Sequence, residues 1–212
     1  ADRASQEALK LAPELPEAHA ARGLTLFLMQ RPEEAEEAFR KAISLDPLLF
    51  QARYFHGRAC FQDGRMEEAA SEFREAARIR EDYQASFLAA QSLEALGRTE
   101  EARVQLMEAL WVVEKHMELN PDDPRAATMR AVSLCRLGRP EEGLLWAEKA
   151  LEIDPEDAGV RYNVACLFSL EGKADDALRC LAVALDRGFH NKEWFENDPD
   201  LDPLRSDPRF QE

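Results

Sequence analysis

The sequence lacks any apolar run approaching the roughly 20 residues that a membrane-spanning helix requires, and residues 1–10 show no basic-then-apolar export signal. Cysteine is scarce, with 4 residues and no C-x-x-C pair, which is typical of reduced thiols in a cytoplasm-like compartment. Glycine is also scarce, with 9 among 212 residues, and this excludes a collagen-like chain. We therefore expect a cytoplasmic protein with no membrane partner.

Positive charge is in the minority, with 27 basic against 42 acidic residues and a formal net charge of −15. This balance argues against a nucleic-acid partner, because binding to phosphates depends on clustered Lys and Arg. The chain is instead 45% apolar and 33% charged, a composition typical of a folded, helix-compatible protein. A chain of this length can bury a sizeable core without metals or disulfides.

One hexapeptide occurs five times along the chain. Its first residues lie 34, 33, 41 and 34 residues apart, in QRPEEA at 30–35, GRMEEA at 64–69, GRTEEA at 97–102, GRPEEG at 138–143 and GKADDA at 172–177. A period near 34 residues indicates an array of stacked structural repeats. Glycine can take the left-handed conformation that ends one helix, and the acidic pair suits the positive end of the next. The hexapeptide is therefore predicted to be a turn between two helices.

Amphipathic patterns flank this turn on both sides. After it, a bulky residue and then an alanine share one helical face, at Phe39 and Ala42, Phe73 and Ala76, Leu106 and Ala109, Ala147 and Ala150, and Leu181 and Ala184. Before it, a small residue and a second residue three positions later do the same, at 23 and 26, 57 and 60, 90 and 93, 131 and 134, and 165 and 168. Proline after Asp46, Asn120 and Asp154 closes the second helix. The repeated unit is thus helix, short turn, helix, with small residues that let the two helices approach closely.

These positions resemble the tetratricopeptide repeat, whose signature W-x2-L-G-x2-Y, A-x3-F and P matches the small, alanine, bulky and proline positions above. The resemblance covers nearly the whole chain. It implies an all-α fold, a right-handed α-solenoid of stacked antiparallel helix pairs with a short C-terminal cap. The chain departs from the signature in the first helix. Where the family usually has Trp and Leu, it has His19 and Arg22, Arg53 and His56, Ser86 and Ala89, Ala127 and Arg130, and Arg161 and Val164.

The register of the repeat divides the chain into consecutive segments. Residues 1–15 are predicted to be the second helix of a truncated preceding repeat, which would make the chain part of a longer protein. Five repeats follow, at 16–49, 50–82, 83–123, 124–157 and 158–188, and a cap occupies 189–212. We expect eleven helices before the cap.

The interval of 41 residues is 34 plus 7, and the added residues fall within positions 109–121. Seven residues are two helical turns, so we expect one helix over about 99–120 that is longer by about 10 Å. One apolar stripe continues through it, formed by Leu106, Leu110, Val113 and Met117. Two roles are open for the extension. It packs against the next repeat, or it projects and presents Trp111 and Val112 to a partner.

After Gly188 the repeat pattern is replaced by a segment with three Asp-Pro steps, at 198, 202 and 207. Asp before Pro suits a helix N-cap and first turn, so we expect several short turns or helices. Their apolar side chains would cover the open end of the last repeat, namely Trp194, Phe195, Leu201, Leu204 and Phe210. The segment also resembles the end of tetratricopeptide regions in multidomain bacterial regulatory proteins. An alternative role is a docking segment for another copy of the protein.

Catalytic motifs are lacking, with no G-x-S-x-G elbow, Walker loop, H-E-x-x-H or dinucleotide glycine pattern. We therefore expect no enzyme activity and no cofactor. His56 and Cys60 lie four residues apart on one predicted helix, but no second pair supplies the further ligands of a closed zinc site, so no metal site is predicted. Cys60 occupies a position where the family has a buried Tyr and is expected to be a core thiol. Cys166 and Cys180 are expected to be reduced and packed.

The resemblance implies that the first helices line a concave groove. The residues three before and one after the buried small position share a face. With their neighbours they form the predicted partner-binding set, Tyr54, Arg58, Phe87, Gln91, Arg125, Met129, Tyr162 and Asn163. Aromatic residues, Met and Arg are enriched in protein recognition sites. None of the pairs has the Lys and Asn combination with which chaperone-tail-binding members of the family hold a carboxylate.

The sequence therefore predicts a protein–protein interaction scaffold that binds a peptide or helical segment of a partner protein in this groove. The alternative is a regulatory or self-association module of a larger signalling protein, for which a homo-oligomer is possible.

Overall fold

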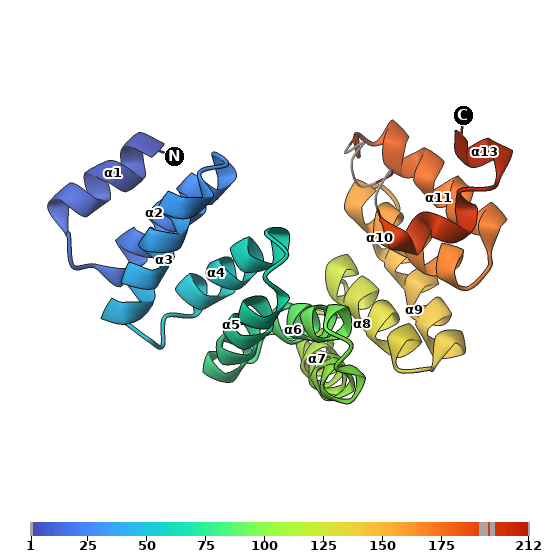
Figure 1. The fold of residues 1–212 in the computed structure, drawn as a ribbon. Coiled ribbons are helices and arrows are strands. Elements are labelled where there is room, and N and C mark those ends of the chain that lie inside the picture. Colours follow the sequence, from blue (N-terminus) through green and yellow to red (C-terminus); the bar gives the residue numbers. More distant parts are fainter. Residues whose placement is uncertain (1, 191–194, 196–197, 212) are drawn as a thin grey trace. The chain divides into compact units, whose positions relative to one another are not determined.

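Every regular element in the described part of the computed structural model is a helix (Figure 1). The described residues are 2–190, 195 and 198–211. In chain order the elements are α1 (Asp2–Leu11), α2 (Pro16–Leu28), α3 (Pro32–Leu45), α4 (Phe50–Gln62), α5 (Met66–Ile79), α6 (Tyr83–Ala95), α7 (Thr99–Leu119), α8 (Pro124–Arg136), α9 (Pro140–Ile153), α10 (Ala158–Leu170), α11 (Ala174–Asp186), the 3-10 helix η1 (Pro199–Leu204) and α13 (Pro208–Gln211). The predictions of an all-α fold and of eleven helices before the cap are confirmed.

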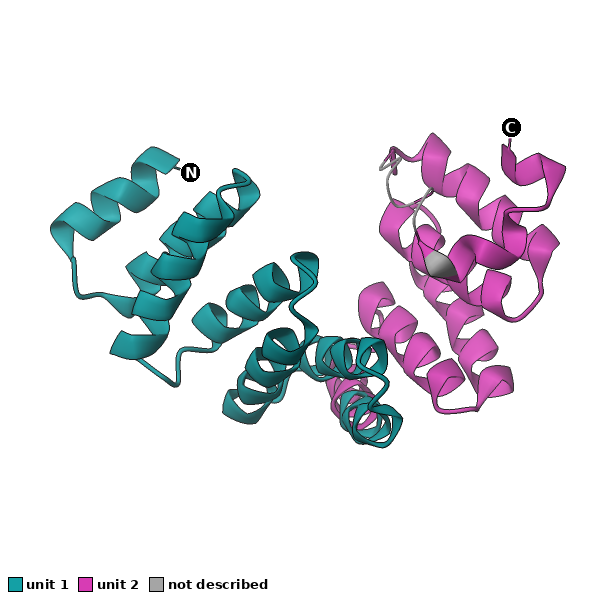
Figure 2. Cartoon of the chain, in the orientation of Figure 1, with its two compact units in different colours: residues 1–109 teal, residues 110–212 magenta. Residues whose placement is uncertain are grey.

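The chain divides into two compact units, residues 1–109 (unit 1) and residues 110–212 (unit 2), as Figure 2 shows. The division falls within α7. In unit 1, α2 packs against α3, α4 against α5, and α5 against α6. In unit 2, α8 packs against α9 and α10 against α11. Each unit therefore consists of helix hairpins stacked on their neighbours.

The hexapeptide forms the turn of each hairpin. Its first residue has a positive φ throughout, 56° at Gln30, 76° at Gly64, 72° at Gly97, 80° at Gly138 and 71° at Gly172. After α4, the Arg65 N–H donates to the Cys60 carbonyl at 2.8 Å and the Gly64 N–H donates to the Phe61 carbonyl at 3.1 Å. This is the hydrogen-bond pattern of a glycine C-cap. The left-handed residue thus ends the first helix, as predicted.

A basic side chain next to the turn residue adds an ion pair. It donates to the glutamate three residues later at 2.6 to 2.9 Å, in the pairs Arg31–Glu34, Arg65–Glu68, Arg98–Glu101 and Arg139–Glu142. Within unit 1, Arg65 also donates to Glu36 at 2.8 Å and Arg98 to Glu67 at 2.7 Å, both on the preceding hairpin. Each pair at the surface stabilises the fold little. Together they link successive hairpins.

Small residues bring the two helices of a hairpin close together. Phe73 on α5 is fully buried, and its ring lies over Gly57 of α4. A Cβ at Gly57 would lie 2.9 Å from that ring, which is closer than side-chain carbons approach. Phe39 covers Gly23 in the same way, where the distance would be 2.6 Å. The predicted close contact at small residues is confirmed in both hairpins.

In three of the repeats, the polar residue that replaces the expected tryptophan of the first helix contacts the backbone. Arg53 Nε and Arg161 Nε each donate to the carbonyl oxygen of the proline six residues earlier, at 2.9 Å. His19 Nε2 lies 2.8 Å from the Pro13 carbonyl oxygen. These side chains therefore tie the start of the first helix to the turn that precedes it.

The residue that replaces the expected leucine of the first helix matches the residue at a corresponding position of the preceding helix. In the first hairpin Arg22 takes this position and forms an ion pair with Asp2 of α1. The repeat at 83–123 has Ala89 there, and Ala70 stands at the position that corresponds to Asp2; both alanines are buried. Opposite charges therefore pair at these two positions in the first hairpin, whereas the repeat at 83–123 has apolar residues at both.

Helix α7 has 21 residues, whereas the second helices of the other four hairpins have 13 or 14, so the predicted lengthening is confirmed. The predicted apolar stripe is buried along its whole length, at Leu106, Leu110, Val113 and Met117. Trp111 is 54% exposed, but Val112 is only 7% exposed. The hypothesis of a projection that presents both side chains is wrong for Val112, because packing buries it.

The C-terminal segment covers the last hairpin, as predicted. Leu201 and Leu204 of η1 are fully buried, and η1 packs on α10. Phe195 meets the ring of Tyr162 edge-on, with centroids 5.4 Å apart. Trp194, which the sequence also assigns to the cap, lies outside the described residues.

The cap repeats a contact that one hairpin makes with the next. Within unit 1, the Tyr54 hydroxyl on α4 donates to Gln84 Oε1 on α6 at 3.2 Å. Tyr162 has the equivalent position in the last repeat, and its hydroxyl donates to Asp198 Oδ2 of the cap at 2.7 Å. The cap therefore stands where the first helix of another hairpin would stand.

An ion pair of the cap helix α13 also corresponds to a contact between successive hairpins. Arg209 of α13 donates to Asp175 Oδ1 at 2.7 Å. Asp175 corresponds in the repeat to Glu67, which accepts from Arg98 of the following turn, also at 2.7 Å. Arg209 thus takes the role of the next turn arginine.

Candidate partner-binding surfaces

Tyr54 lies where two hairpins of unit 1 meet. Its ring stacks on Phe50 with centroids 5.4 Å apart and meets Phe73 edge-on at 5.9 Å. Burial raises the pKa of its hydroxyl. The side chain is half-buried, so only part of it is accessible to a partner.

Two further residues of the predicted set in unit 1 differ in exposure from expectation. Phe87 on α6 is buried, at 7% exposure, and Gln91 is half-buried. The expectation that Phe87 lines an open groove is wrong, because the position three before the small residue faces packed neighbours. Arg58, one residue after the small position, is exposed on α4. Its guanidinium makes no hydrogen bond or ion pair with a residue that the structure describes.

In unit 2, Arg125 and Asn163 are exposed and Met129 is half-buried. Tyr162 is only 1% exposed, and its ring stacks on Phe189 with centroids 4.4 Å apart. The expectation that this ring is open to a partner is wrong, because the cap covers it. The structure thus keeps Arg125, Met129 and Asn163 accessible at least in part.

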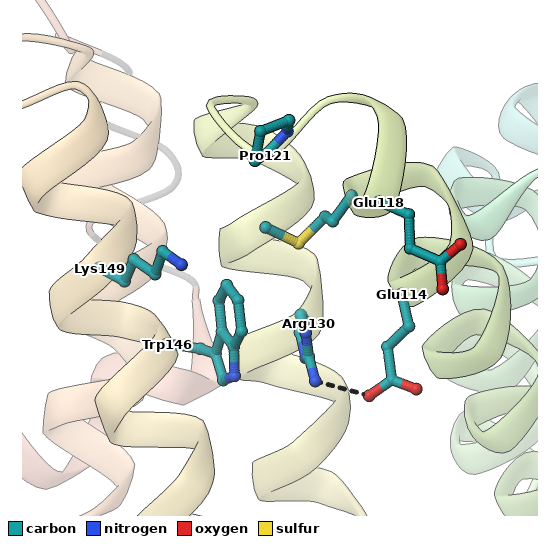
Figure 3. Close-up of a pocket in the computed structure, with 7 residues that line it drawn as sticks. Glu114, Glu118, Pro121, Arg130, Trp146 and Lys149 are labelled. Carbon is teal, nitrogen blue, oxygen red and sulfur yellow. Dashed lines mark hydrogen bonds and ion pairs between the residues drawn. The ribbon is translucent and has the colours of Figure 1, made fainter.

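Unit 2 also contains a pocket of about 190 Å³ between the end of α7 and the hairpin α8–α9 (Figure 3). It is lined by Glu114, Met117, Glu118, Pro121, Arg130, Trp146 and Lys149. Arg130 donates to Glu114 Oε1 at 2.8 Å, and its guanidinium lies 4.0 Å from the centroid of the Trp146 ring. Lys149 Nζ lies 4.5 Å from the same centroid. The sequence analysis did not predict this pocket or the role of Trp146. Two features of the sequence could have indicated it, namely the added residues of α7 and Arg130 at the position where the family usually has Leu.

A buried ionic cluster lies inside unit 1, centred on His56 of α4. Glu36 Oε2 of α3 lies 2.9 Å from His56 Nε2, and Glu72 Oε1 of α5 lies 3.5 Å from Nδ1. Arg65 donates to Glu36 at 2.8 Å, and Arg53 donates to Glu72 at 2.9 Å. The imidazole, which is 4% exposed, thus lies between two carboxylates that are each bound by an arginine. We call these five residues the His56 cluster.

The charges in the His56 cluster support one another. Burial by itself would lower the pKa of His56, but contacts with Cys60 and Glu72 and the charge of Glu36 raise it to about 10. Burial would raise the pKa of both glutamates, yet Arg65, Arg53 and His56 hold it below its usual value. Sequence reasoning missed Glu36 and Glu72, because they belong to two other helices that only packing brings to His56.

Comparison with known proteins gives the family. One model of the tetratricopeptide repeat matches residues 1–49, 21–83 and 108–158, which is more than half of the chain, and a second matches residues 84–106. The chain belongs to the tetratricopeptide repeat (TPR) family. Among the described residues of this TPR protein, no helix is long and apolar enough to cross a membrane.

Relatives share the repeat and the fold. The TPR repeat-containing thioredoxin TTL4 of Arabidopsis thaliana is 32% identical over 77 residues, which are 36% of this chain and only 11% of that protein. TTC0263, a thermophilic TPR protein of Thermus thermophilus, has a TM-score of 0.64 at 20% identity, over 83% of this chain and 93% of its own. YrrB, a TPR protein with an unusual peptide-binding site, has a TM-score of 0.57 at 23% identity, over 90% and 95%. The two solved structures show the TPR fold.

The His56 cluster predicts how the stability of this TPR protein depends on pH. A group whose pKa is raised by folding contributes its full stabilisation below its unfolded value, near 6.5 for His56, and loses it as the pH rises through the folded value of about 10. We therefore expect the free energy of unfolding, measured in urea with EDTA present, to fall between about pH 6.5 and 10. His56→Gln should flatten this fall, whereas His190→Gln, at an exposed position, should not. Equal slopes in the wild type and His56→Gln would contradict the assignment.

Proposed function

We propose that this TPR chain is a protein–protein interaction scaffold that binds an acidic segment of a partner protein on the exposed face of its first helices. The main support is Arg58, which is exposed on α4 and makes no ion pair with a described residue. Carboxylates are in excess in this chain, with a net charge of −15, and yet none of those that the structure describes pairs with this guanidinium. Such a guanidinium suits the bidentate binding of a carboxylate from outside the chain.

Arg58 shares the first helices of unit 1 with amide side chains that suit an extended segment. Gln51 and Gln62 are exposed on the same helix, and Gln91 is partly exposed on α6. Amide side chains both donate and accept, so they can bind the backbone of a segment whose acidic side chain pairs with Arg58. YrrB, which shares the fold, has a peptide-binding site.

In finer detail, we propose a separate contact surface in each unit, formed by residues of the set chosen from the sequence. They are Tyr54, Arg58 and Gln91 in unit 1 and Arg125, Met129 and Asn163 in unit 2. Arg125 resembles Arg58 in that it is exposed and its guanidinium is without a described partner. Phe87 and Tyr162 are left out, because their side chains are buried.

A second candidate function is a regulatory or self-association module of a larger bacterial signalling protein. Trp111 favours it, because a ring that is 54% exposed on α7, with Lys115 Nζ 5.0 Å from its centroid, is suited to a protein contact. Sedimentation velocity separates the two functions. Self-association should produce oligomers as the protein concentration rises, and Trp111→Ser should abolish them.

The scaffold function is tested with peptides. A random peptide library is selected on the full chain, and the affinity of the selected peptides is measured by calorimetry. We expect Asp- or Glu-containing peptides to be enriched and Arg58→Glu to weaken them about tenfold or more. The loss should shrink at higher salt, because the interaction between exposed charges is screened over about 10 Å at 0.1 M.

The matched control is Arg103→Glu. Arg103 is also exposed in unit 1 and has no described ion pair, but it lies on the second helix α7. It should leave the affinity of the same peptides unchanged. Equal losses in both variants would mean that only net charge matters, and an unaltered affinity in folded Arg58→Glu would reject the proposed surface.

A further inference from the structure

Three side chains with different metal-binding atoms meet in unit 1. Glu36 comes from α3, and His56 and Cys60 lie one turn apart on α4. A carboxylate oxygen of Glu36, a ring nitrogen of His56 and Sγ of Cys60 all lie within 4.8 Å of one another. Cys60 is fully buried and His56 is 4% exposed. Glu36 of the preceding hairpin thus places a third potential ligand atom beside those of His56 and Cys60.

We propose that Glu36, His56 and Cys60 bind one Zn²⁺ ion. A set of one sulfur, one nitrogen and one oxygen suits zinc, whereas calcium and magnesium prefer oxygen ligands alone. Zinc bonds of about 2.0–2.1 Å place two ligand atoms of a tetrahedral site about 3.3 Å apart. Glu36 Oε2 and His56 Nε2 are 2.9 Å apart, so small shifts of the two side chains admit the ion between them. Three protein ligands leave the fourth position to water.

Contacts behind the ligands suit this site. With zinc on Nε2, Nδ1 of His56 has the proton and faces Glu72 Oε1 at 3.5 Å, where a shift of about half an ångström makes a hydrogen bond. Arg65 donates to Glu36 at 2.8 Å and orients its carboxylate. A carboxylate on the second nitrogen of a histidine ligand, and a hydrogen bond to a carboxylate ligand, are recurrent features of zinc sites.

The charge balance also permits the ion. Zinc replaces one proton on the His56 imidazolium and one on the Cys60 thiol, and both protons leave to solvent. Two positive charges leave and two arrive, so the total charge of the cluster does not change. The ion pairs of Glu72 with Arg53 and of Glu36 with Arg65 can therefore persist around the metal.

The ligand set occurs only once along the repeats of the sequence. At the position of Cys60 the other repeats have Leu26, Leu93, Leu134 and Phe168, and at the position of His56 they have Arg22, Ala89, Arg130 and Val164. The first repeat has Arg22 and Asp2 in an ion pair where the second has His56 and Glu36. The positions of His56 and Cys60 are thus apolar or arginine in the other repeats, and only Glu36 has an acidic counterpart, Asp2.

The experiment uses the full chain, reduced and stripped of metal with EDTA that is then removed. Titration with Co²⁺ should give one ion per chain and a thiolate-to-cobalt charge-transfer band, and Zn²⁺ should displace the cobalt. X-ray absorption of the zinc-loaded chain should show one sulfur at about 2.3 Å and lighter ligands at about 2.0–2.2 Å. The second measurement needs no variant, so it holds even where a substitution impairs folding.

Variants identify the ligands. Cys60→Ser should remove the charge-transfer band and weaken zinc binding at least tenfold, and His56→Gln should weaken it similarly. The matched control is Cys180→Ser, which alters a buried thiol of unit 2 and should change neither. A zinc environment without sulfur, less than one ion per chain, or unchanged binding in folded Cys60→Ser would overturn the proposal.

Discussion

Replacement of Tyr162 by Ala should lower the free energy of unfolding by about 3–5 kcal/mol, the usual cost of removing a large aromatic ring from a core. The side chain is 1% exposed. Its ring stacks on Phe189 at 4.4 Å, and its hydroxyl donates to Asp198 Oδ2 at 2.7 Å. Urea unfolding of the full chain, followed by circular dichroism, measures the loss. Because each hairpin depends on its neighbours, the last hairpin should unfold first.

Tyr162→Phe separates the two contributions. It keeps the ring and removes only the hydrogen bond to Asp198, so it should cost about 1 kcal/mol. Equal losses for Ala and Phe would mean that ring packing is unimportant and that the cap is held by other contacts. A large loss for Ala alone supports the cap as a substitute for another hairpin.

Replacement of Glu72 by Gln should lower the free energy of unfolding by about 3 kcal/mol at neutral pH, because removing one member of a buried ionic group leaves its partners without compensation. Glu72 is the carboxylate that faces His56 Nδ1 and accepts from Arg53, and 17% of its side chain is exposed. Urea unfolding at pH 7 with EDTA present measures the effect without any contribution from bound metal.

Glu67→Gln is the matched control for this change. Glu67 also accepts from an arginine, Arg98 at 2.7 Å, but 72% of its side chain is exposed. Water and salt screen such a pair, so the variant should unfold as the wild type does. Equal effects of the two substitutions would mean that burial does not determine how much the His56 cluster contributes to the free energy of unfolding.

The helices and turns were predictable because their causes are local. A glycine or another left-handed residue ends the first helix, carboxylates begin the second, and proline closes it, whatever the rest of the chain does. Within one hexapeptide, Gly64 ends the first helix, and Glu67 and Glu68 begin the second. The lengthened α7 followed from counting residues against the period.

Which side chains face a partner was less predictable, because a helical face has a boundary that depends on its neighbours. The position three before the small residue was assigned to the groove, yet at Phe87 and Tyr162 it is buried. The residue one position after it, Arg58, is exposed as expected. A helical period fixes which residues share a face, but the next hairpin decides how much of that face it covers.

The repeat, the helix pairs, the turns and the cap follow from the sequence alone, since each depends on the conformational preferences of a few adjacent residues. The meeting of Glu36, His56 and Glu72 does not, because they belong to three helices and their approach depends on packing. The role of Tyr162 is also tertiary, since the 36 positions that separate it from Asp198 have no pattern that fixes their distance. Secondary structure follows from residues that are adjacent in the sequence, whereas a site requires residues that come close together only when the hairpins stack.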